Sequence, residues 1–171
     1  MEKTTALALK LQLITSQRKG EVAGAEWKDF DLKNNWWTIP AEKAKNGFPH
    51  RVPLSSLAIE VLGELSQITG DSEWLFPSPR AGQHIAETSI DHAVRVNVDH
   101  FKITHFVPHD LRRTAASMIT ASGIPRLTVS KILNHVESGV TAVYDRHSYD
   151  KEKRVALEKW SKRLEKIVKA T

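Results

Sequence analysis

The pattern of apolar and polar positions in the first third of the chain predicts two helices followed by a β-hairpin. Residues 6–17 carry leucine or isoleucine nearly all round a helix, which is typical of a buried helix rather than a surface one. A short helix of small residues is predicted over 20–27, and the polar stretch 29–35 is turn-like. Residues 36–40 and 50–54 are rich in aromatic and β-branched side chains on either side of a polar turn. They predict two antiparallel strands.

The rest of the chain shows helical periodicity. Further helices are predicted over residues 56–70, 87–98, 110–123, 127–134, about 139–147, and from 150 onward. Ser55 or Ser56 can cap the first of these, and Gly70 ends it. Gly123 suits a left-handed helix end. The whole pattern predicts one mainly α domain with a small antiparallel β-sheet, an α+β fold without internal repeats.

Length and composition fit a single globular domain. The chain has 171 residues, 40% hydrophobic and 26% charged, and no low-complexity tract. It contains no cysteine, which excludes disulfides, thiolate catalysis and cysteine-ligated metals. No apolar run approaches the roughly 20 residues that span a bilayer, and the N-terminus lacks a signal-peptide pattern. We therefore expect a soluble, intracellular protein without a membrane partner.

The charge is basic but unevenly distributed. The formal net charge is +5, of which residues 150–171 contribute +4 through eight Lys or Arg and four Asp or Glu. The remaining 149 residues carry only +1. Composition alone therefore does not establish DNA binding, and the positions of individual cations have to decide it.

The first candidate chemistry lies at the head of the helix predicted from residue 110. His109 and Arg112 are three residues apart, a spacing that puts two side chains on one helix face. An imidazole can exchange a proton, and a guanidinium forms planar pairs of hydrogen bonds that match phosphate oxygens. The pair is thus suited to a phosphodiester, although solvated His and Arg are also common on helices.

Four further positions have both an ordinary and a functional interpretation. Arg18, after a buried helix, can simply interact with the helix dipole. Lys45 can be a solvated turn residue, His135 can cap a helix C-terminus, and Tyr144 can be a half-buried core tyrosine. None of the four decides the function singly, so the functional interpretation depends on their joint order.

That joint order resembles the tyrosine recombinases, the family of bacteriophage integrases. The matching segments are Thr15-Ser16-Gln17-Arg18-Lys19-Gly20-Glu21, Ala44-Lys45-Asn46-Gly47, His50-Arg51-Val52-Pro53-Leu54, His109-Asp110-Leu111-Arg112-Arg113-Thr114, Leu133-Asn134-His135, and Tyr144 nine residues later. Residues 144–149 look most like integrases of satellite phages and genomic islands. The resemblance covers nearly all 171 residues, and so many separated motifs at family spacing make accidental agreement improbable.

The chain departs from the family pattern in three respects. The family usually has glycine where Asn134 stands and threonine-glycine where Ser16-Gln17 stands. Neither position is catalytic, so we expect little effect. Integrases of this kind also carry DNA-binding domains before the catalytic domain, whereas here the first helix begins almost at Met1. We therefore expect residues 1–171 to be an isolated catalytic domain, the C-terminal part of a longer integrase, with residues 150–171 as a C-terminal helical tail.

The resemblance implies that a tyrosine attacks DNA. Tyr144 would be the nucleophile that attacks the scissile phosphorus, leaving a 3′-phosphotyrosine and a free 5′-hydroxyl. Tyr149 is the other tyrosine nearby, and the spacing from His135 favours Tyr144. By resemblance Lys45 is the general acid for the 5′ leaving oxygen, carried into the minor groove by a mobile hairpin.

The remaining site residues are assigned to the phosphate. By the same resemblance, Arg18 and Arg112 would hold its non-bridging oxygens. His109 and His135 would orient the phosphate and share proton transfer. Glu21 would support an arginine. We expect His50 and His147 to be structural, and His84, His92, His100 and His105 have no metal-site spacing.

The implied function is site-specific recombination that integrates or excises a phage or genomic island. No cofactor and no metal are expected. The expected partners are double-stranded DNA with attachment sites, other integrase protomers in a synaptic tetramer, and accessory DNA-bending proteins. The expected location is the bacterial cytoplasm, in association with the nucleoid.

Two other functions fit parts of the sequence. Residues 120–124 and 128–133 have the glycine turn and aliphatic positions of a helix-turn-helix, which would make the protein a non-catalytic DNA-binding regulator. However, Ile119 stands where that motif needs a small residue, and Arg18, Lys45 and Tyr144 would have no role. A type IB topoisomerase would share much of the site.

The tail also has two interpretations. Its apolar positions, including Leu157, Trp160 and Leu164, can pack on their own domain or dock on a neighbouring protomer. If the tail docks on a neighbour, removal of residues 151–171 should impair synaptic assembly or control of cleavage more than folding.

Overall fold

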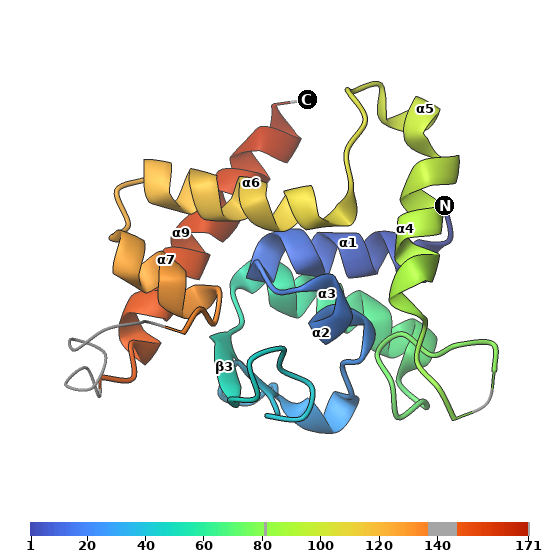
Figure 1. Ribbon diagram of the computed structural model, residues 1–171, viewed down its shortest axis with the longest axis horizontal. Helices are drawn as coiled ribbons and strands as arrows, with labels where there is room; N and C mark the ends of the chain where they lie inside the picture. Colours follow the sequence, from blue (N-terminus) through green and yellow to red (C-terminus); the bar gives the residue numbers. More distant parts are fainter. Residues whose placement is uncertain (81, 137–146, 171) are drawn as a thin grey trace.

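The computed structural model describes residues 1–80, 82–136 and 147–170, and these form helices around one small sheet (Figure 1). The elements are α1 (Lys3–Thr15), α2 (Lys19–Ala23), a 3₁₀ turn (Trp27–Asp29), β1 (Phe30–Asp31), β2 (Trp36–Ile39), β3 (His50–Pro53), α3 (Ser56–Thr69), α4 (Glu87–Val96), α5 (Val98–Phe101), α6 (Pro108–Ala121), α7 (Arg126–Ile132) and α9 (Asp150–Lys169). This arrangement confirms the predicted mainly α fold with a small antiparallel sheet. None of the described helices is long and apolar enough to cross a membrane.

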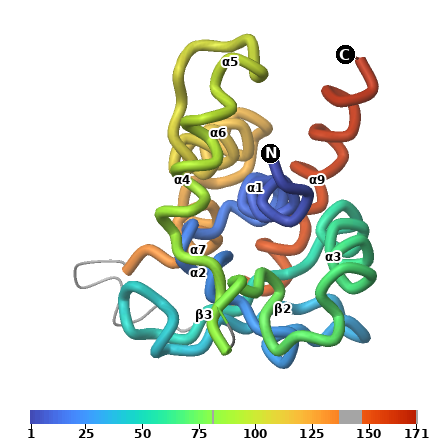
Figure 2. The backbone as a smooth tube through the Cα atoms, turned by 90° about the vertical axis from the view of Figure 1, so that its right-hand side faces the viewer, coloured from blue at the N-terminus to red at the C-terminus, as the bar shows by residue number. Residues whose placement is uncertain are grey.

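Helix α1 lies at the centre of the molecule. Figure 2 shows it nearly along its axis, with α3 and α9 on one side and α4 and α6 on the other. Leu7, Leu11 and Ile14 are almost completely buried, as expected for a helix with apolar side chains nearly all round. The helix packs against α3, α6 and α9, so residues from both halves of the chain share one core.

The helix that carries His109 starts two residues earlier than predicted. Helix α6 begins at Pro108, and the carboxylate of Asp110 accepts the backbone N–H of Val107 at 3.0 Å. Proline at the first position and an acid in the first turn both favour a helix start. His109 therefore lies inside the first turn of α6. The helix ends at Ala121, followed by Gly123 with φ of +87°, which confirms the predicted left-handed turn.

The sheet has three antiparallel strands in the order β1-β2-β3. The predicted hairpin is present, with Trp37 paired to Val52 in register. Strand β1 occupies two residues of the stretch 29–35 that the polar pattern assigned to a turn, so that assignment was wrong for Phe30 and Asp31 and is confirmed for residues 32–35. A two-residue strand is too short to show alternation, and Phe30 is fixed there by stacking on Trp37 with ring centroids 5.2 Å apart.

Other boundaries also differ from the sequence prediction, and the short helix predicted over 20–27 already ends at Ala23. Helix α1 extends back to Lys3, and α7 is shorter than predicted because the chain turns after Ile132. The helix predicted over 87–98 ends at Val96, where Asn97 separates it from α5. The helix predicted near 139–147 lies almost entirely outside the described residues, as does Tyr144.

Helix α9 packs on its own domain. Leu157 and Trp160 are buried, and the indole N–H of Trp160 donates a hydrogen bond to the Leu13 carbonyl at 2.9 Å. The helix contacts α1, α3, α6, α7 and β3. These contacts correspond to the first interpretation of the tail, in which it packs on its own domain. Figure 1 shows α9 running diagonally behind α6 and α7.

Candidate active site

Arg18 is placed by the turn between α1 and α2. Helix α1 ends at Thr15, and Ser16 adopts a left-handed conformation with φ of +60°. Arg18 then occupies the position just before α2, where its backbone N–H and its Nη1 both donate to the Glu21 carboxylate at 2.9 Å. Glu21 is buried, whereas the Arg18 side chain is 21% exposed. The carboxylate thus fixes a cation that can still meet solvent.

Arg112 joins two segments that are far apart in the sequence. It is 4% exposed, and its Nη1 and Nη2 donate to the carbonyls of Ser16 and Leu133, each at 2.6 Å. Burial, followed by the nearby charge of Arg18, lowers the pKa of Arg112 to about 10. A guanidinium with that pKa still carries its charge near neutral pH. The Arg112 side chain therefore connects the turn before Arg18 with the end of α7.

His109 and Arg112 share α6 but differ in exposure. His109 is exposed in the first turn, and Arg112 lies one turn further in the interior. Partial burial, then the charges of Arg113 and Arg112, lower the pKa of His109. Neutral imidazole, which can both donate and accept a proton, is therefore favoured at this position near pH 7.

The C-terminal end of α7 accepts hydrogen bonds from several segments. The Ile132 carbonyl accepts from Gln17 Nε2 at 3.1 Å and from His50 Nε2 at 3.0 Å. The next two carbonyls accept from Arg112 Nη2 and from Asn46 Nδ2, the latter at 2.9 Å. Because helix ends leave carbonyls without helical partners, these side chains complete the hydrogen bonding of the α7 end. They also fix the backbone that leads into His135.

His50 is one of the residues that complete this end. It is 5% exposed, and burial, followed by the charge of Lys153, lowers its pKa to about 4. The imidazole is therefore neutral near pH 7, and its Nε2–H donates to Ile132. These contacts agree with the structural role expected for His50. The position of His50 in a predicted strand was the sequence signal for a structural role. Nothing in the sequence indicated that Gln17 and Asn46 also bind carbonyls at the end of α7.

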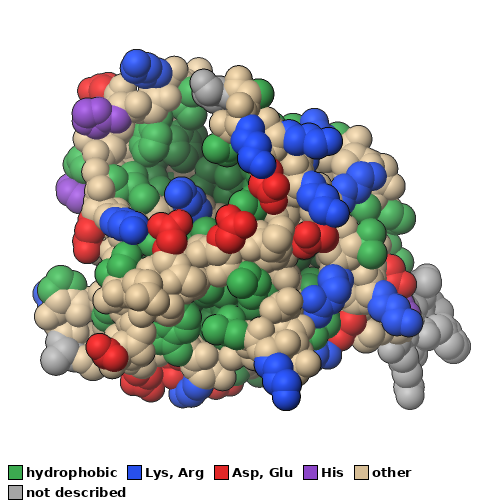
Figure 3. Space-filling model, turned by 180° about the vertical axis from the view of Figure 1, so that it is seen from behind, with side chains coloured by type: hydrophobic (Ala, Val, Ile, Leu, Met, Phe, Trp, Pro, Cys, Tyr) green, Lys and Arg blue, Asp and Glu red, His purple; other side chains and the backbone are tan. Residues whose placement is uncertain are grey.

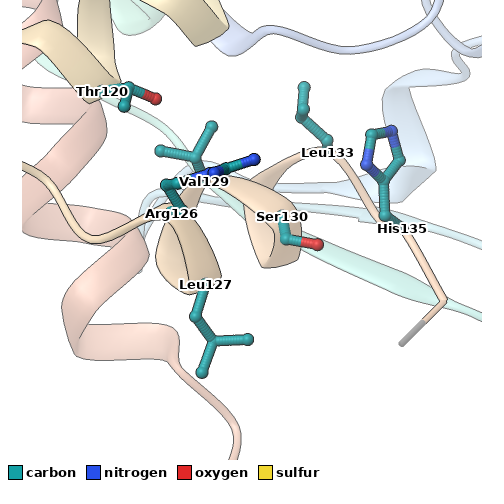
Figure 4. A pocket seen from close by; sticks show the side chains of 7 residues that line it. All are labelled: Thr120, Arg126, Leu127, Val129, Ser130, Leu133 and His135. Atoms are coloured by element: carbon teal, nitrogen blue, oxygen red, sulfur yellow. The ribbon is translucent and has the colours of Figure 1, made fainter. Parts of the chain in front are cut away.

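His135 stands on the segment that leaves α7 (Figure 4). Its backbone N–H donates to the Ser130 carbonyl at 3.1 Å, and its side chain is exposed. It lines a cavity that extends along one side of α7. The other residues of that cavity are Thr120, Arg126, Leu127, Val129, Ser130 and Leu133.

The segment between β2 and β3 carries two lysines with different surroundings. Lys43 pairs with Glu26 at 2.5 Å and Asp29 at 2.7 Å and lies over the Trp74 ring. Lys45 is exposed and forms no ion pair with any residue that the structure describes. The contacts of Lys43 therefore give it a structural role, whereas the exposed Lys45 can contact a ligand.

An open cleft of about 900 Å³ brings Arg18, Lys45 and His109 together. Its lining also includes Lys19, Gly20, Glu21, Gly24, Glu42, Lys43, Trp74, His84, Glu87, Asp91 and Val107. Arg112 does not line this cleft, because its guanidinium is engaged between two backbone segments, and His135 lines the cavity beside α7. No group of His, Asp or Glu suited to a metal ion occurs among the described residues.

The fold is that of known integrase catalytic cores. The integrase from mycobacterium phage Brujita superposes with a TM-score of 0.73 at 19% identity, covering 92% of this chain and 52% of that one. The lambda integrase catalytic core superposes with a TM-score of 0.64 at 19% identity, covering 80% of this chain and 82% of that one. These similarities define the class of the fold.

The sequence defines the family. The model of the phage integrase family matches residues 1–151, and the chain belongs to this family. Prophage integrase IntA of Escherichia coli K12 is 29% identical, covering 88% of this chain and 36% of that protein. The integrase of Enterobacteria phage P4 is 30% identical, covering 91% and 39%. The chain thus spans less than half the length of these two relatives, and its similarity to them confirms the expected resemblance to satellite-phage integrases.

Proposed function

We propose that this chain is the catalytic domain of a site-specific DNA recombinase that acts in integration or excision of a phage or genomic island. The observation that carries the proposal is the convergence of Arg18, Lys45 and His109 on one open cleft. The buried Arg112 is hydrogen-bonded to the carbonyls of Ser16 and Leu133, two residues before Arg18 and His135 respectively. Cations and imidazoles gathered in this way suit a phosphodiester.

The proposed reaction is a transesterification. The Tyr144 oxygen attacks phosphorus and the bond to the 5′ oxygen breaks, which leaves a 3′-phosphotyrosine and a 5′-hydroxyl. The tyrosine proton must leave, because a phenol of pKa about 10 is almost entirely protonated near pH 7. We assign its acceptance to the imidazoles of His109 and His135. The neutral state favoured for His109 supports this assignment.

The cations have two roles in this proposal. Arg18 and Arg112 offset the charge on the non-bridging oxygens, with Glu21 holding Arg18 in place. Lys45 gives a proton to the departing 5′ oxygen, for which its exposure in the cleft is suited. The ester bond is retained in the covalent intermediate, so the 5′-hydroxyl of a second strand can reverse the step without ATP.

The proposed partners are double-stranded DNA with attachment sites, other protomers, and accessory DNA-bending proteins. Solved lambda integrase structures of the same fold include a dimer bound to a COC′ core site and a tetramer bound to a Holliday junction. By analogy we propose that this domain acts in a tetrameric synaptic complex, as part of a longer integrase with N-terminal DNA-binding domains.

The surroundings of Tyr149 support Tyr144 as the nucleophile, in addition to the spacing of Tyr144 from His135. Tyr149 is half-buried at the start of α9, with its ring against His147 at 4.7 Å and Lys131 at 5.1 Å. Its own backbone has φ of +56°. A tyrosine held between α7 and α9 in this way is suited to a structural role, which supports Tyr144 as the nucleophile.

Trapping on nicked suicide DNA tests both the function and the nucleophile. A nick near the cleavage site releases the leaving strand, so the covalent protein–DNA band accumulates on a denaturing gel. Tyr144→Phe should abolish the band, and Tyr149→Phe, its matched control, should retain it. The reverse result would refute the assignment of the nucleophile.

The gel also separates the alternative functions. If DNA is bound but no variant or wild-type protein forms a covalent band, the protein is a regulator rather than a recombinase. If the wild-type monomer relaxes supercoiled DNA of any sequence, the topoisomerase function is favoured instead.

A further inference from the structure

A reciprocal pair of amides links two segments of the site. Asn46 Nδ2 donates to the Asn134 backbone carbonyl at 2.9 Å, and Asn134 Nδ2 donates to Asn46 Oδ1 at 3.2 Å. The two residues are 88 positions apart in the sequence. Asn46 Oδ1 also accepts the backbone N–H of Phe48 at 3.1 Å, so the same amide shapes its own turn. One side-chain pair thus joins the β2–β3 segment to the end of α7.

Both asparagines are direct neighbours of proposed site residues. Asn46 follows Lys45, and Asn134 precedes His135. On the N-terminal side of Lys45 the segment is held by the ion pairs of Lys43 and by the buried Ala44, whereas on its C-terminal side a Cβ at Gly47 would meet open space and Phe48 is 60% exposed. The amide pair is therefore the contact that fixes the backbone directly after Lys45.

The backbone at Asn134 does not by itself require an asparagine. Its φ of +50° is left-handed, a conformation that glycine adopts without strain and asparagine tolerates. Glycine is also the residue that the family pattern usually has here. An asparagine at this position adds an amide group to a backbone that glycine would serve equally well. In this chain the added amide has a defined partner, Asn46.

We propose that Asn46 and Asn134 are positioning residues that hold Lys45 beside the 5′ leaving oxygen. The inference rests on the proposed function and adds to it. The pair joins the β2–β3 segment, which the resemblance predicts to be mobile, to the end of α7, and so places the lysine that protonates the leaving group relative to the histidine that follows α7. Neither asparagine takes part in bond making.

The test compares two leaving groups in Asn134→Gly. The variant suits the left-handed backbone and removes the hydrogen bond from Asn134 Nδ2 to Asn46 Oδ1, while the carbonyl of residue 134 can still accept from Asn46 Nδ2. Single-turnover cleavage is measured on nicked DNA with the natural 5′ oxygen and on the same DNA with a bridging 5′ sulfur. A thiolate leaves without protonation, since a thiol is far more acidic than an alcohol. We expect cleavage of the oxygen substrate to fall about tenfold, a typical effect of losing such hydrogen bonds, with little change on sulfur.

Controls separate positioning from folding. Asn35→Gly is the matched control, because Asn35 also has a left-handed backbone, with φ of +58°, but lies outside the cleft. It should cleave both substrates at the wild-type rate. Asn46→Ala removes both hydrogen bonds of the pair, so it should lower cleavage of the oxygen substrate at least as much as Asn134→Gly, again with little change on sulfur. In a Lys45→Ala background, Asn134→Gly should have no further effect, since the lysine it positions is gone.

Each outcome has a distinct meaning. If Asn134→Gly cleaves the oxygen substrate at the wild-type rate, or loses cleavage of both substrates equally, the positioning inference is wrong. If the wild-type protein forms no covalent product on either substrate, the proposed function itself fails. Thermal unfolding of each variant shows whether a loss on both substrates reflects folding.

Discussion

At the scale of single residues, the site is held together by side chains that bind backbone carbonyls. Arg112 binds the carbonyls of Ser16 and Leu133, and His50 and Gln17 bind that of Ile132. Each bond fixes a backbone segment that ends in a proposed site residue. Hydrogen bonds between buried groups make such an arrangement rigid, and loss of one partner leaves the other buried group unpaired, at a cost in stability.

The buried imidazole of His50 makes stability depend on pH. Its pKa in the folded protein is about 4, below the ordinary 6.5, so the unfolded chain binds the proton more readily between these values. The contribution of His50 to the unfolding free energy is therefore fully present above pH 6.5 and is lost as the pH drops toward 4. We expect this residue to contribute a loss of about 2 kcal/mol between pH 7.5 and pH 5.

Urea unfolding at the two pH values measures this loss. The control variant is His50→Gln, which can still donate to the Ile132 carbonyl but does not titrate, and it should lose correspondingly less stability. An equal loss in both proteins would show that other groups cause the pH dependence.

At the scale of elements, the β2–β3 segment separates a structural lysine from a functional one. Lys43 is bound to Glu26, whose pKa is lowered to about 2 by hydrogen bonds from Lys28 and Lys43. Lys43→Ala leaves that buried carboxylate with fewer partners and should reduce the unfolding free energy by about 1.5–3 kcal/mol. Lys45→Ala should leave stability within about 0.5 kcal/mol of wild type while abolishing most cleavage.

Denaturant titration and suicide-substrate trapping on both variants make the comparison. The two lysines are two residues apart in the same loop, so each serves as the control for the other. If Lys45→Ala cleaves normally and Lys43→Ala folds normally but does not cleave, the proposed roles of the two lysines are reversed.

Helix α9 belongs to the core of the domain. Trp160 is 3% exposed, and its truncation to alanine removes a buried ring and the hydrogen bond to Leu13. We expect Trp160→Ala to cost about 3–5 kcal/mol, and removal of residues 151–171 to prevent folding altogether. Val155→Ala, at a side chain 63% exposed on the same helix, should change stability by less than about 0.5 kcal/mol.

Circular dichroism of the purified variants measures these effects. If the tail instead docked on a neighbouring protomer, removal of residues 151–171 would leave the domain folded. A truncated protein that is folded and monomeric but fails to assemble on DNA would therefore support docking in trans and contradict the packing of α9 as a core helix.

At the scale of the whole molecule, charge is spread rather than concentrated. Figure 3 shows Lys and Arg side chains interspersed with Asp and Glu over one face. With a net charge of +1 outside residues 150–171, we expect the domain to bind DNA weakly. The affinity should fall steeply between about 50 and 200 mM salt, by about tenfold or more even for a few phosphate contacts. Fluorescence anisotropy over this range checks it, and a salt-independent affinity would show that ionic contacts do not dominate.

The fold was largely readable because most helices have a strong period. The buried α1, the hairpin and the stop at Gly70 followed from apolar spacing and turn residues. The two-residue β1 did not, since alternation needs several residues. For the site, motif order indicated the candidates, but it could not show that Arg112 is buried, that Lys43 is tied to Glu26, or that Asn46 meets Asn134.

The sequence by itself therefore determined the class of fold, the family resemblance and the residue types suited to a phosphodiester, because these depend on local periodicity and on short motifs. The tertiary structure alone decided which cations face the cleft and which bind carbonyls or carboxylates of the protein itself. That distinction depends on contacts between distant segments, such as Arg112 with Ser16, 96 positions apart, and Gln17 with Ile132, 115 positions apart. Such contacts form only when the helices pack, so no local pattern records them.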